Sequence, residues 1–528
     1  MKDNIPASPQ GDEPVNLLNH SSKLGQVSNL ANHFVADVIV YFPVAILPAI
    51  FALIGSMVFT RIYTPDEYGV FGFSVAIITP IVTFLTEWAA QPLGRFYSEF
   101  KNNQQLDLYS HVVSLFVTIA ILILILGSSA ILGGIYFVQG HWPSLWIFTG
   151  AVLLMISQCL LMIPLPILPA SFQSRPYRFI VVSSSGLVIL FPLMMNYLFG
   201  VNIAWMLWGQ FFATILFVPY LYKITHLHLG TIVAQITPEL VNVVKRFGRY
   251  GLPMSFWFLA IHLLNSGDRI VLQVFRTSAE VGIYSVNYSL VAGIVGLVNS
   301  PINLALGPLL YYQWKDRSTK NTEQTLSLMT ELYIILALFV LAAVVVVAKP
   351  LVSLLLGEMF QAGVVILIPV LLGRMVWGLS MIGQKSLELN ERTDLIVRSA
   401  LVALLANVVL NIWLIPRFGF IAAAYTTIAS NLIYALLIWL KTKQFVPWKL
   451  HFFQYAPYIF SCLISIGTGS LLIRGIEFDL LQLVIGGSVC LLTYAGLVYL
   501  FAGKKIRLLF KPETHFLPME ETRDKPKF

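Results

Sequence analysis

The residues most able to bind a ligand or a proton are the charged ones that interrupt apolar segments of the sequence. Within otherwise apolar segments, the sequence places six ionisable residues: Glu87, His262, Asp268, Arg269, Glu331 and Arg374. Such a residue costs at least about 2.5 kcal/mol on insertion into a membrane, so it faces a hydrated cavity or a partner. Arginine suits phosphate because its planar fork donates two hydrogen bonds at once. The pattern predicts that Arg269 and Arg374 contact an anionic substrate. Arg61, at the end of the first apolar segment, either contacts the same substrate or anchors that segment at the membrane–water interface.

A second interpretation of the same charges is interhelical ion pairing, and it stays open. In that case Arg269 or Arg374 pairs with Glu87 and binds no substrate. Asp268 and Arg269 are neighbours in the sequence, and adjacent helical positions point about 100° apart, so they are not expected to pair with each other. Asp268, Glu87 and His262 are therefore candidates either for binding a coupling ion or for ion pairing.

A different acidic motif, TPDE at 64–67, follows the first apolar segment and has the residue order of a capping box. Thr64 would cap the helix, proline would take its first position, and Glu67 would reach back to the cap amide. Thr277 and Glu280 repeat this order ahead of a later apolar segment. We therefore expect these residues to start helices rather than to bind substrate.

The sequence contains no constellation of residues for catalysis. It lacks a GxxxxGK[ST] phosphate loop and the GxSxG, HExxH and CxxC motifs. Its three cysteines, Cys159, Cys462 and Cys490, lie within apolar runs. We predict no enzymatic activity, no metal site and no cofactor, and the lack of a basic patch with interleaved aromatic residues argues against nucleic-acid binding.

The elements that carry these residues are long and apolar. Charged residues make up only 11% of the 528 residues, against about 25% in a soluble domain, and the mean hydropathy is +0.79. Apolar runs of about 20 residues indicate membrane-spanning helices, so the fold class is an all-α polytopic membrane protein. We predict fourteen spans, near residues 35–60, 69–90, 112–138, 144–168, 178–199, 201–222, 250–275, 281–312, 328–348, 361–384, 394–416, 420–440, 453–473 and 480–502.

The distribution of basic residues gives these spans an orientation. With fourteen spans, most of the 33 lysines and arginines fall in the two tails and in every second loop. Cytoplasmic segments carry this excess of positive charge, which places both termini in the cytoplasm. Because the loops on the other side are all short, most of the protein lies within the membrane.

An internal repeat organises the spans into two lobes. Residues that lie 213 positions apart are identical at several places, for example Thr64 and Thr277, or Gly69 and Gly282. The repeated spans are six apart, so both copies share one orientation, as in parallel repeats. The predicted organisation is a cytoplasmic tail, an N-terminal six-helix lobe, a cytoplasmic linker, a C-terminal six-helix lobe, two additional helices and a basic cytoplasmic tail: 1–34, 35–222, 223–249, 250–440, 441–502 and 503–528.

Three stretches carry a likeness to a known family. They are FTRIYTPDEYGVFG at 59–72, NSGDRIVLQVFRTSAEVGIYSVNYSL at 265–290 and NVVLNIWLIPRFGFIAAAYTTIASN at 407–431. In these stretches the chain resembles the bacterial polysaccharide flippases of the multidrug/oligosaccharidyl-lipid/polysaccharide exporter superfamily. All three occur in order and in the expected spans, and the likeness covers about residues 35–440.

The resemblance implies a substrate and a mechanism. It implies that oligosaccharide units on a polyprenyl diphosphate move from the cytoplasmic to the outer leaflet of the bacterial cytoplasmic membrane, for O-antigen, capsule or exopolysaccharide biosynthesis. It implies alternating access between two lobes, with Arg269, and also Arg61 and Arg374, meeting the diphosphate or acidic sugars. Membrane lipid, a coupling H⁺ or Na⁺, and polymerase and chain-length proteins would be the partners.

Two other function classes remain to be weighed against this one. A cation-coupled multidrug or small-molecule exporter of the same superfamily would use Glu87 and Asp268 as ion sites. A membrane-embedded polymerase or ligase would need a large outer loop to hold its acceptor, and the predicted outer loops are short. The exporter is therefore the stronger alternative.

Overall fold

Every secondary-structure element in the described part of the chain is a helix in the computed structural model. It comprises residues 1–528 apart from 1–42, 45, 140–143, 228–236, 315–318 and 510–528. A helix at Ile46–Phe59 comes first. The elements after it are α2 (Pro65–Asn102), α3 (Leu106–Gln139), α4 (Leu145–Met162), α5 (Ile167–Ala170), α6 (Ser174–Phe199), α7 (Ala204–Ile215), α8 (Val218–Thr225), α9 (Pro238–Phe275), α10 (Ser278–Trp314), α11 (Thr319–Leu355), η2 (Glu358–Ile366), α12 (Leu367–Leu389), α13 (Thr393–Thr442), α14 (Phe452–Ile473) and α15 (Asp479–Leu509).

The prediction of an all-α polytopic membrane protein is confirmed. Within the described ranges, eleven helical stretches are long enough and apolar enough to cross a membrane. One of them, α13, contains two helices that meet at Gly419, where the backbone leaves helical geometry. α9 covers the seventh predicted segment, whose hydropathy is lowered by polar residues within it, among them His262, Asp268 and Arg269. The count of fourteen spans itself stays a prediction.

The described residues of the segment predicted as a linker, 223–249, are largely helical. α8 continues to Thr225, and α9 begins at Pro238 with Thr237 as its cap, whose hydroxyl accepts the backbone N–H of Leu240 at 3.2 Å. The ring of Phe247 stacks on that of Phe96 in α2, with centroids 5.2 Å apart. Residues 238–249 therefore form the first turns of α9. The apolar side of this basic segment packs against aromatic side chains of α2.

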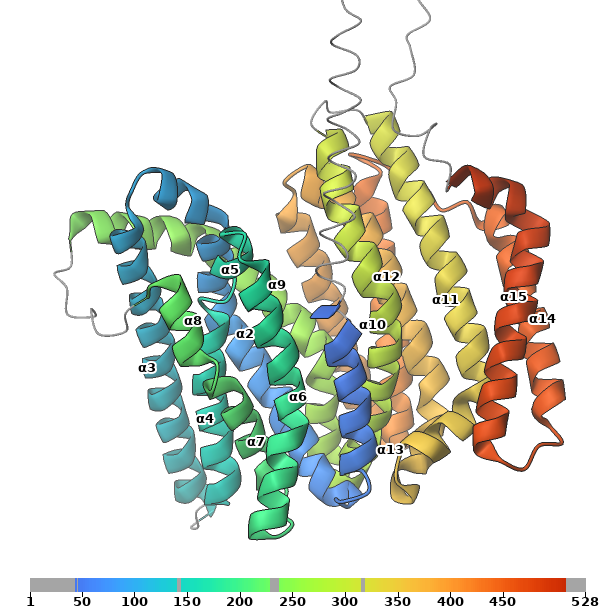
Figure 1. The fold of residues 1–528 in the computed structure, drawn as a ribbon, viewed down its shortest axis with the longest axis horizontal. Helices are drawn as coiled ribbons and strands as arrows, with labels where there is room; N and C mark the ends of the chain where they lie inside the picture. The colour runs from blue at the N-terminus through green and yellow to red at the C-terminus, as the bar shows by residue number, and fades with distance from the viewer. Residues whose placement is uncertain (1–42, 45, 140–143, 228–236, 315–318, 510–528) are drawn as a thin grey trace, which may run out of the picture.

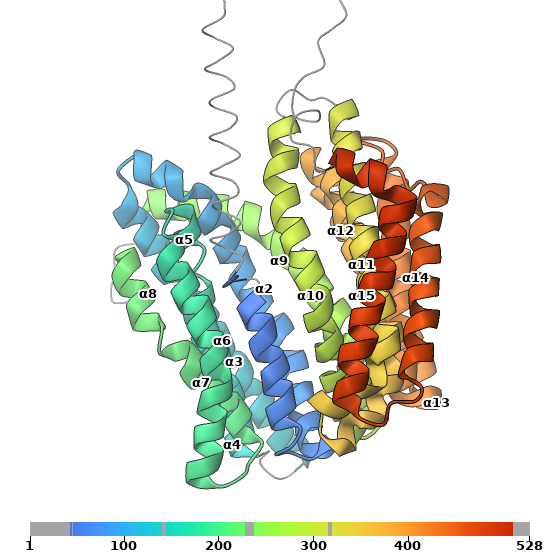
Figure 2. The same ribbon diagram turned by 45° about the vertical axis from the view of Figure 1, so that its right-hand side comes forward.

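The helices form two groups joined along α9. Figure 1 shows α2–α8 on one side and α10, α11, α12, α14 and α15 on the other. Each group has its own buried apolar cluster: Phe116, Leu154 and Leu207 belong to the first, and Val291, Leu326 and Leu371 to the second. α9 packs along both α2 and α13. α14 and α15 lie at the edge against α11, as Figure 2 shows from a second direction.

Candidate functional site

Arg269 lies in the second half of α9, where α9 faces α10. Its guanidinium carbon is 4.7 Å from the centre of the Tyr288 ring of α10, a cation–π contact. Its Nε is buried and has no hydrogen-bond partner among the described residues. The ring of Tyr288 thus holds the guanidinium in place without neutralising it.

Arg374, from α12, reaches the same face of α9. Its Nη1 donates a hydrogen bond of 2.8 Å to Oδ1 of Asn265, and its Nε is buried without a partner in the described part of the chain. Asn265 precedes Arg269 by four residues, so the two side chains lie one turn apart on one side of α9. Asn265 therefore brings Arg374 to the side of α9 that carries Arg269.

The acidic candidates form no ion pair with Arg269 or Arg374 in the described part of the chain. Among the described residues, the ion pairs involve other side chains than Arg269, Arg374 and Glu87. Glu87 instead accepts a hydrogen bond from Gln91 at 2.7 Å. Because a cation inside a membrane is costly without a counter-charge, this pair of guanidinium groups is suited to an anionic ligand.

Asp268 lies in the α9–α10 contact, and its Oδ1 accepts the backbone N–H of Arg269 at 2.8 Å. It is only 1% exposed, and it accepts a hydrogen bond from the hydroxyl of Tyr284. His262 lies two turns before Arg269 on the same face of α9 and is half-buried. Even with Asp268 ionised, two guanidinium groups leave the site with a net positive charge.

Two other charged candidates lie in contacts away from the arginine pair. Arg61 donates hydrogen bonds to the carbonyl oxygens of Leu354, at 2.7 Å, and of Leu355, at 3.1 Å, where α11 ends. A cation is favourable there because it faces the negative end of the helix dipole. Glu331 is buried in α11 and accepts a hydrogen bond of 2.5 Å from the hydroxyl of Tyr458 in α14.

The two capping motifs differ in how they use the glutamate. In the first, the backbone N–H of Glu67 donates to Oγ1 of Thr64, and Oε2 of Glu67 accepts the Thr64 N–H at 2.9 Å. In the second, the backbone N–H of Glu280 donates to Oγ1 of Thr277 at 3.3 Å, but the carboxylate turns elsewhere. The first copy is a complete capping box, whereas the second has only its threonine half.

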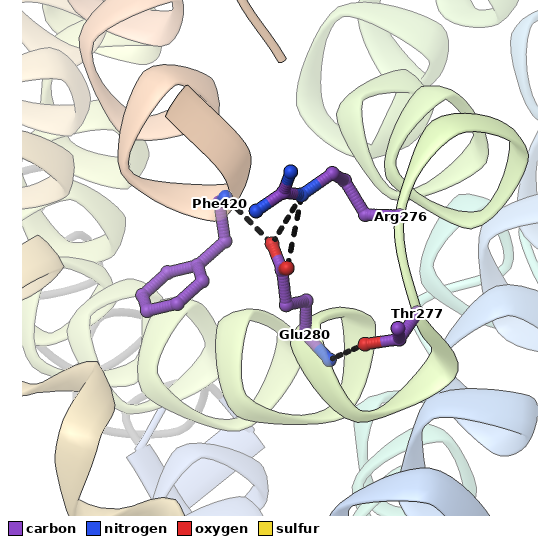
Figure 3. A network of polar contacts seen from close by, with 4 residues as sticks. All are labelled: Arg276, Thr277, Glu280 and Phe420. Atoms are coloured by element: carbon purple, nitrogen blue, oxygen red, sulfur yellow. Dashed lines mark hydrogen bonds and ion pairs between the residues drawn. The ribbon is translucent and has the colours of Figure 1, made fainter. Parts of the chain in front are cut away.

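Figure 3 shows where the Glu280 carboxylate goes. It lies between Arg276 and the start of the second half of α13, accepting hydrogen bonds from Nε of Arg276 at 2.9 Å and from the backbone N–H of Phe420 at 3.2 Å. The carboxylate thus caps the helix that follows Gly419 instead of its own. This contact fixes α13 to the beginning of α10.

Sequence reasoning found the charges of the site but missed the residues that arrange them. Asn265 and Tyr288 are uncharged, so a search for ionisable residues passes over them. A signal for Asn265 was present, because a polar residue four positions before an arginine lies beside it on a helix. Tyr288 gave no such signal, since its role depends on how α9 and α10 pack.

Comparisons with known proteins agree with this architecture. The family model described as "Polysaccharide biosynthesis protein" matches residues 34–314. The chain is 23% identical over 242 residues to the probable low-salt glycan biosynthesis flippase Agl15 of Haloferax volcanii, covering 44% of this chain and 50% of the relative. It therefore spans about half the length of the curated relative that it matches.

Solved structures share the fold. The lipid II flippase MurJ, in an inward closed conformation, has a TM-score of 0.70 at 14% identity, covering 89% of this chain and 99% of that one. An inward-facing multidrug resistance MATE transporter of the MOP superfamily has a TM-score of 0.60 at 11% identity, covering 77% of this chain and 97% of that one. Because this family model matches more than half of its residues, the chain belongs to the polysaccharide biosynthesis protein family.

Proposed function

We propose that this protein is a flippase for oligosaccharide repeat units linked to a polyprenyl diphosphate. It carries them from the cytoplasmic to the outer leaflet for surface polysaccharide biosynthesis, which includes O-antigen, capsule and exopolysaccharide. The observation that supports this best is the pair of half-buried arginines, Arg269 and Arg374, which form no ion pair with a carboxylate among the described residues. Arg374 bonds to Asn265, one helical turn from Arg269 on α9.

A diphosphate matches this pair in charge and in hydrogen bonding. It offers only acceptor oxygens, and each guanidinium offers a planar set of donors, so two arginines on facing helices can hold its two phosphate groups. The apolar surroundings strengthen these charge-assisted bonds because little water competes for the donors. The site would bind the diphosphate that all polyprenyl-diphosphate-linked substrates share, so it does not specify which sugars are transported.

The proposed membrane arrangement follows from the charge pattern and from the family. We place the protein in the bacterial cytoplasmic membrane, with both termini in the cytoplasm. The transport units would be an N-terminal lobe, 35–222, and a C-terminal lobe, 250–440, with 441–502 as two additional helices. Alternating access would move these lobes about the arginine site, coupled to H⁺ or Na⁺, and polymerase and chain-length proteins would use the product.

Deleting the gene tests the substrate and the direction of transport together. We expect undecorated lipid-linked repeat units to accumulate in the cytoplasmic leaflet, because the glycosyltransferases that build them act before this step. Digestion of oriented membrane vesicles with a glycosidase that cannot cross the membrane reports the leaflet. Normal glycan export combined with increased drug sensitivity would contradict the proposal.

That contrary outcome would favour a cation-coupled multidrug or small-molecule exporter. The buried carboxylate of Asp268, held by the Tyr284 hydroxyl, is the observation in its favour, since intramembrane acids are common ion sites in transporters. Uptake of a fluorescent drug by inverted vesicles, driven by a proton or sodium gradient, separates the two. The flippase proposal expects no gradient-driven drug uptake.

Asn265 gives a second test that needs no natural substrate. With Asn265→Leu, Arg374 loses its partner and its orientation, and with Asn265→Asp a carboxylate competes for it, so both variants should lose binding of an anion. The readout is the rise in melting temperature that inorganic pyrophosphate gives the purified protein in detergent. We expect at least about a tenfold loss of pyrophosphate affinity, as misplacing one charge-assisted bond implies.

A matched control is Asn196→Leu. Asn196 donates a hydrogen bond of 2.6 Å to the hydroxyl of Tyr63, outside the arginine contacts. This variant should lower the melting temperature and yet keep the pyrophosphate response. Unchanged pyrophosphate affinity in both Asn265 variants would show that Asn265 does not arrange the site.

A further inference from the structure

The first turns of α9 lie across the ends of α2 and α3. Figures 1 and 2 show this stretch transverse to the other helices, and α9 contacts both α2 and α3. Its apolar residues recur at helical spacing and pack on the apolar cluster of the first group of helices: Leu240, Val243, Val244 and Phe247. The opposite side of this amphipathic stretch is therefore turned away from the helix bundle.

Basic side chains occupy that outward side and continue onto the last turns of α2. Lys245 and Arg249, one turn apart on α9, are exposed, and so is Arg95 of α2. None of these three residues forms an ion pair in the described part of the chain. We call Arg95, Lys245 and Arg249 the basic surface.

Two contacts between arginines and aromatic rings hold the basic surface together. The guanidinium carbon of Arg95 is 4.6 Å from the centre of the Tyr250 ring of α9. In return, the guanidinium carbon of Arg246 of α9 is 4.3 Å from the centre of the Phe96 ring of α2. A cation–π contact attracts the charge to the face of the ring and uses none of the N–H donors. Arg95 therefore keeps its donors for another group.

The acidic residue beside the basic surface is already paired. Both oxygens of the Glu99 carboxylate accept hydrogen bonds of 2.7 Å from Arg246. Glu239, in the first turn of α9, is the other acid in the stretches 95–102 and 238–250. The same two stretches carry five basic residues: Arg95, Lys101, Lys245, Arg246 and Arg249. With five basic residues against two acidic ones, this end of the first group of helices has a net positive charge.

The length of α2 places Arg95 at the level of lipid head groups. With both termini in the cytoplasm, α2 begins at the outer face of the membrane, and Arg95 follows Pro65 by 30 residues. Because a helix rises about 1.5 Å per residue, the two positions are about 45 Å apart along α2. A bilayer with its head groups is about 40–45 Å thick. The basic surface therefore lies among the head groups of the cytoplasmic leaflet.

We propose that the basic surface binds the anionic head groups of phospholipids in the cytoplasmic leaflet. Basic residues beside membrane-spanning helices on the cytoplasmic side attract such lipids, and a guanidinium group donates two hydrogen bonds at once to a phosphate. A lipid phosphate bound there joins the end of α2 to the first turns of α9 and holds them at the membrane surface. This binding involves no transported glycan and goes beyond the proposed flippase function.

Stabilisation of the purified protein by lipid, in an uncharged detergent, tests this binding. Phosphatidylglycerol should raise the melting temperature, and phosphatidylcholine should not. The test variant combines Arg95→Gln, Lys245→Gln and Arg249→Gln. Each basic residue near an anionic membrane surface contributes roughly fivefold to affinity. The triple variant should therefore need at least about twentyfold more phosphatidylglycerol for the same rise in melting temperature.

A matched control removes the same amount of charge near the two ends of α13, with Arg398→Gln, Lys441→Gln and Lys443→Gln. It should respond to phosphatidylglycerol as the unmodified protein does. An equal rise with phosphatidylcholine, an unchanged response of the test variant, or an equal loss in both triple variants overturns the proposal. So does a rise that comes from soluble glycerol 3-phosphate or polyglutamate and not from phosphatidylglycerol, which assigns the surface to a free phosphate ester or to an acidic protein.

A single substitution decides the matter where the triple variant does not purify as a folded protein. Arg95→Gln should need about fivefold more phosphatidylglycerol than Arg398→Gln for the same rise in melting temperature, because Arg95 alone of the two belongs to the basic surface. An equal requirement in these two variants overturns the lipid site. Glycan export enters none of these measurements, so their outcome is independent of whether the protein is a flippase.

Discussion

Replacing Arg269 with alanine is expected to abolish surface glycan display, while the amount of protein in the membrane stays normal. Arg269 forms no ion pair among the described residues, and its Nε is buried there without a partner, so its removal breaks no salt bridge that holds α9. What is lost is a set of charge-assisted bonds to the diphosphate, each worth about 1.5–3 kcal/mol. Two such bonds amount to a loss of at least about a hundredfold in affinity.

A lysine at position 269 tests whether charge alone is enough for transport. Arg269→Lys keeps the charge but not the planar fork, so we expect partial display. Display is measured by staining surface glycan in a deletion strain that carries each variant, and membrane abundance by immunoblot. The matched control is Arg61→Ala, since Arg61 donates to the backbone carbonyls of α11 and should affect stability first. A fall in abundance for Arg269→Ala would instead support a structural role.

The sequence predicted the helices well because membrane spans depend on local composition. An apolar run of about 20 residues has to be a helix in lipid, whatever surrounds it. The helix start at Thr64 was equally predictable, because every atom of a capping box comes from four consecutive residues. The helical turns at 238–249, within the predicted linker, were not predictable, because the charged residues there concealed an apolar side that packs against Phe96.

The sequence was enough to predict which charged residues form the site, but not which residues they contact. Arg269 and Arg374 stand out because ionisable residues are rare inside spans. Whether they meet Glu87, each other or a substrate depends on how α9, α10 and α12 pack, which one sequence does not specify. The structure brings Arg374 to Asn265 and leaves Glu87 with Gln91, so the choice was made by tertiary packing.

Glu280 shows how a correct local pattern can serve a distant contact. The order of Thr277 and Glu280 predicts a capping box, and the threonine half forms. The carboxylate leaves the box because the backbone N–H of Phe420 and the guanidinium of Arg276 provide stronger donors nearby. That opportunity exists only because Gly419 turns the chain so that the next helix begins beside Glu280 (Figure 3).

Replacing Gly419 with alanine should therefore strongly destabilise the protein. Gly419 has φ 61° and ψ −149°, a combination essentially restricted to glycine that costs a side chain about 1–3 kcal/mol. An added Cβ would also lie 2.6 Å from Oε2 of Glu280 and 3.0 Å from Nη2 of Arg276. The carboxylate would have to leave Phe420, which removes a further charge-assisted bond of about 1.5–3 kcal/mol.

A substitution at Gly200 separates the cost of backbone strain from the cost of displacing the Glu280 carboxylate. It too has a positive φ, 82°, but nothing lies within 4 Å of an added Cβ, so Gly200→Ala measures backbone strain alone. We expect Gly419→Ala to lower the melting temperature in detergent clearly more than Gly200→Ala does. In a Glu280→Ala background the excess should largely vanish, because the carboxylate that alanine displaces is already gone. An equal excess in both backgrounds would mean that Glu280 does not hold α13 to α10.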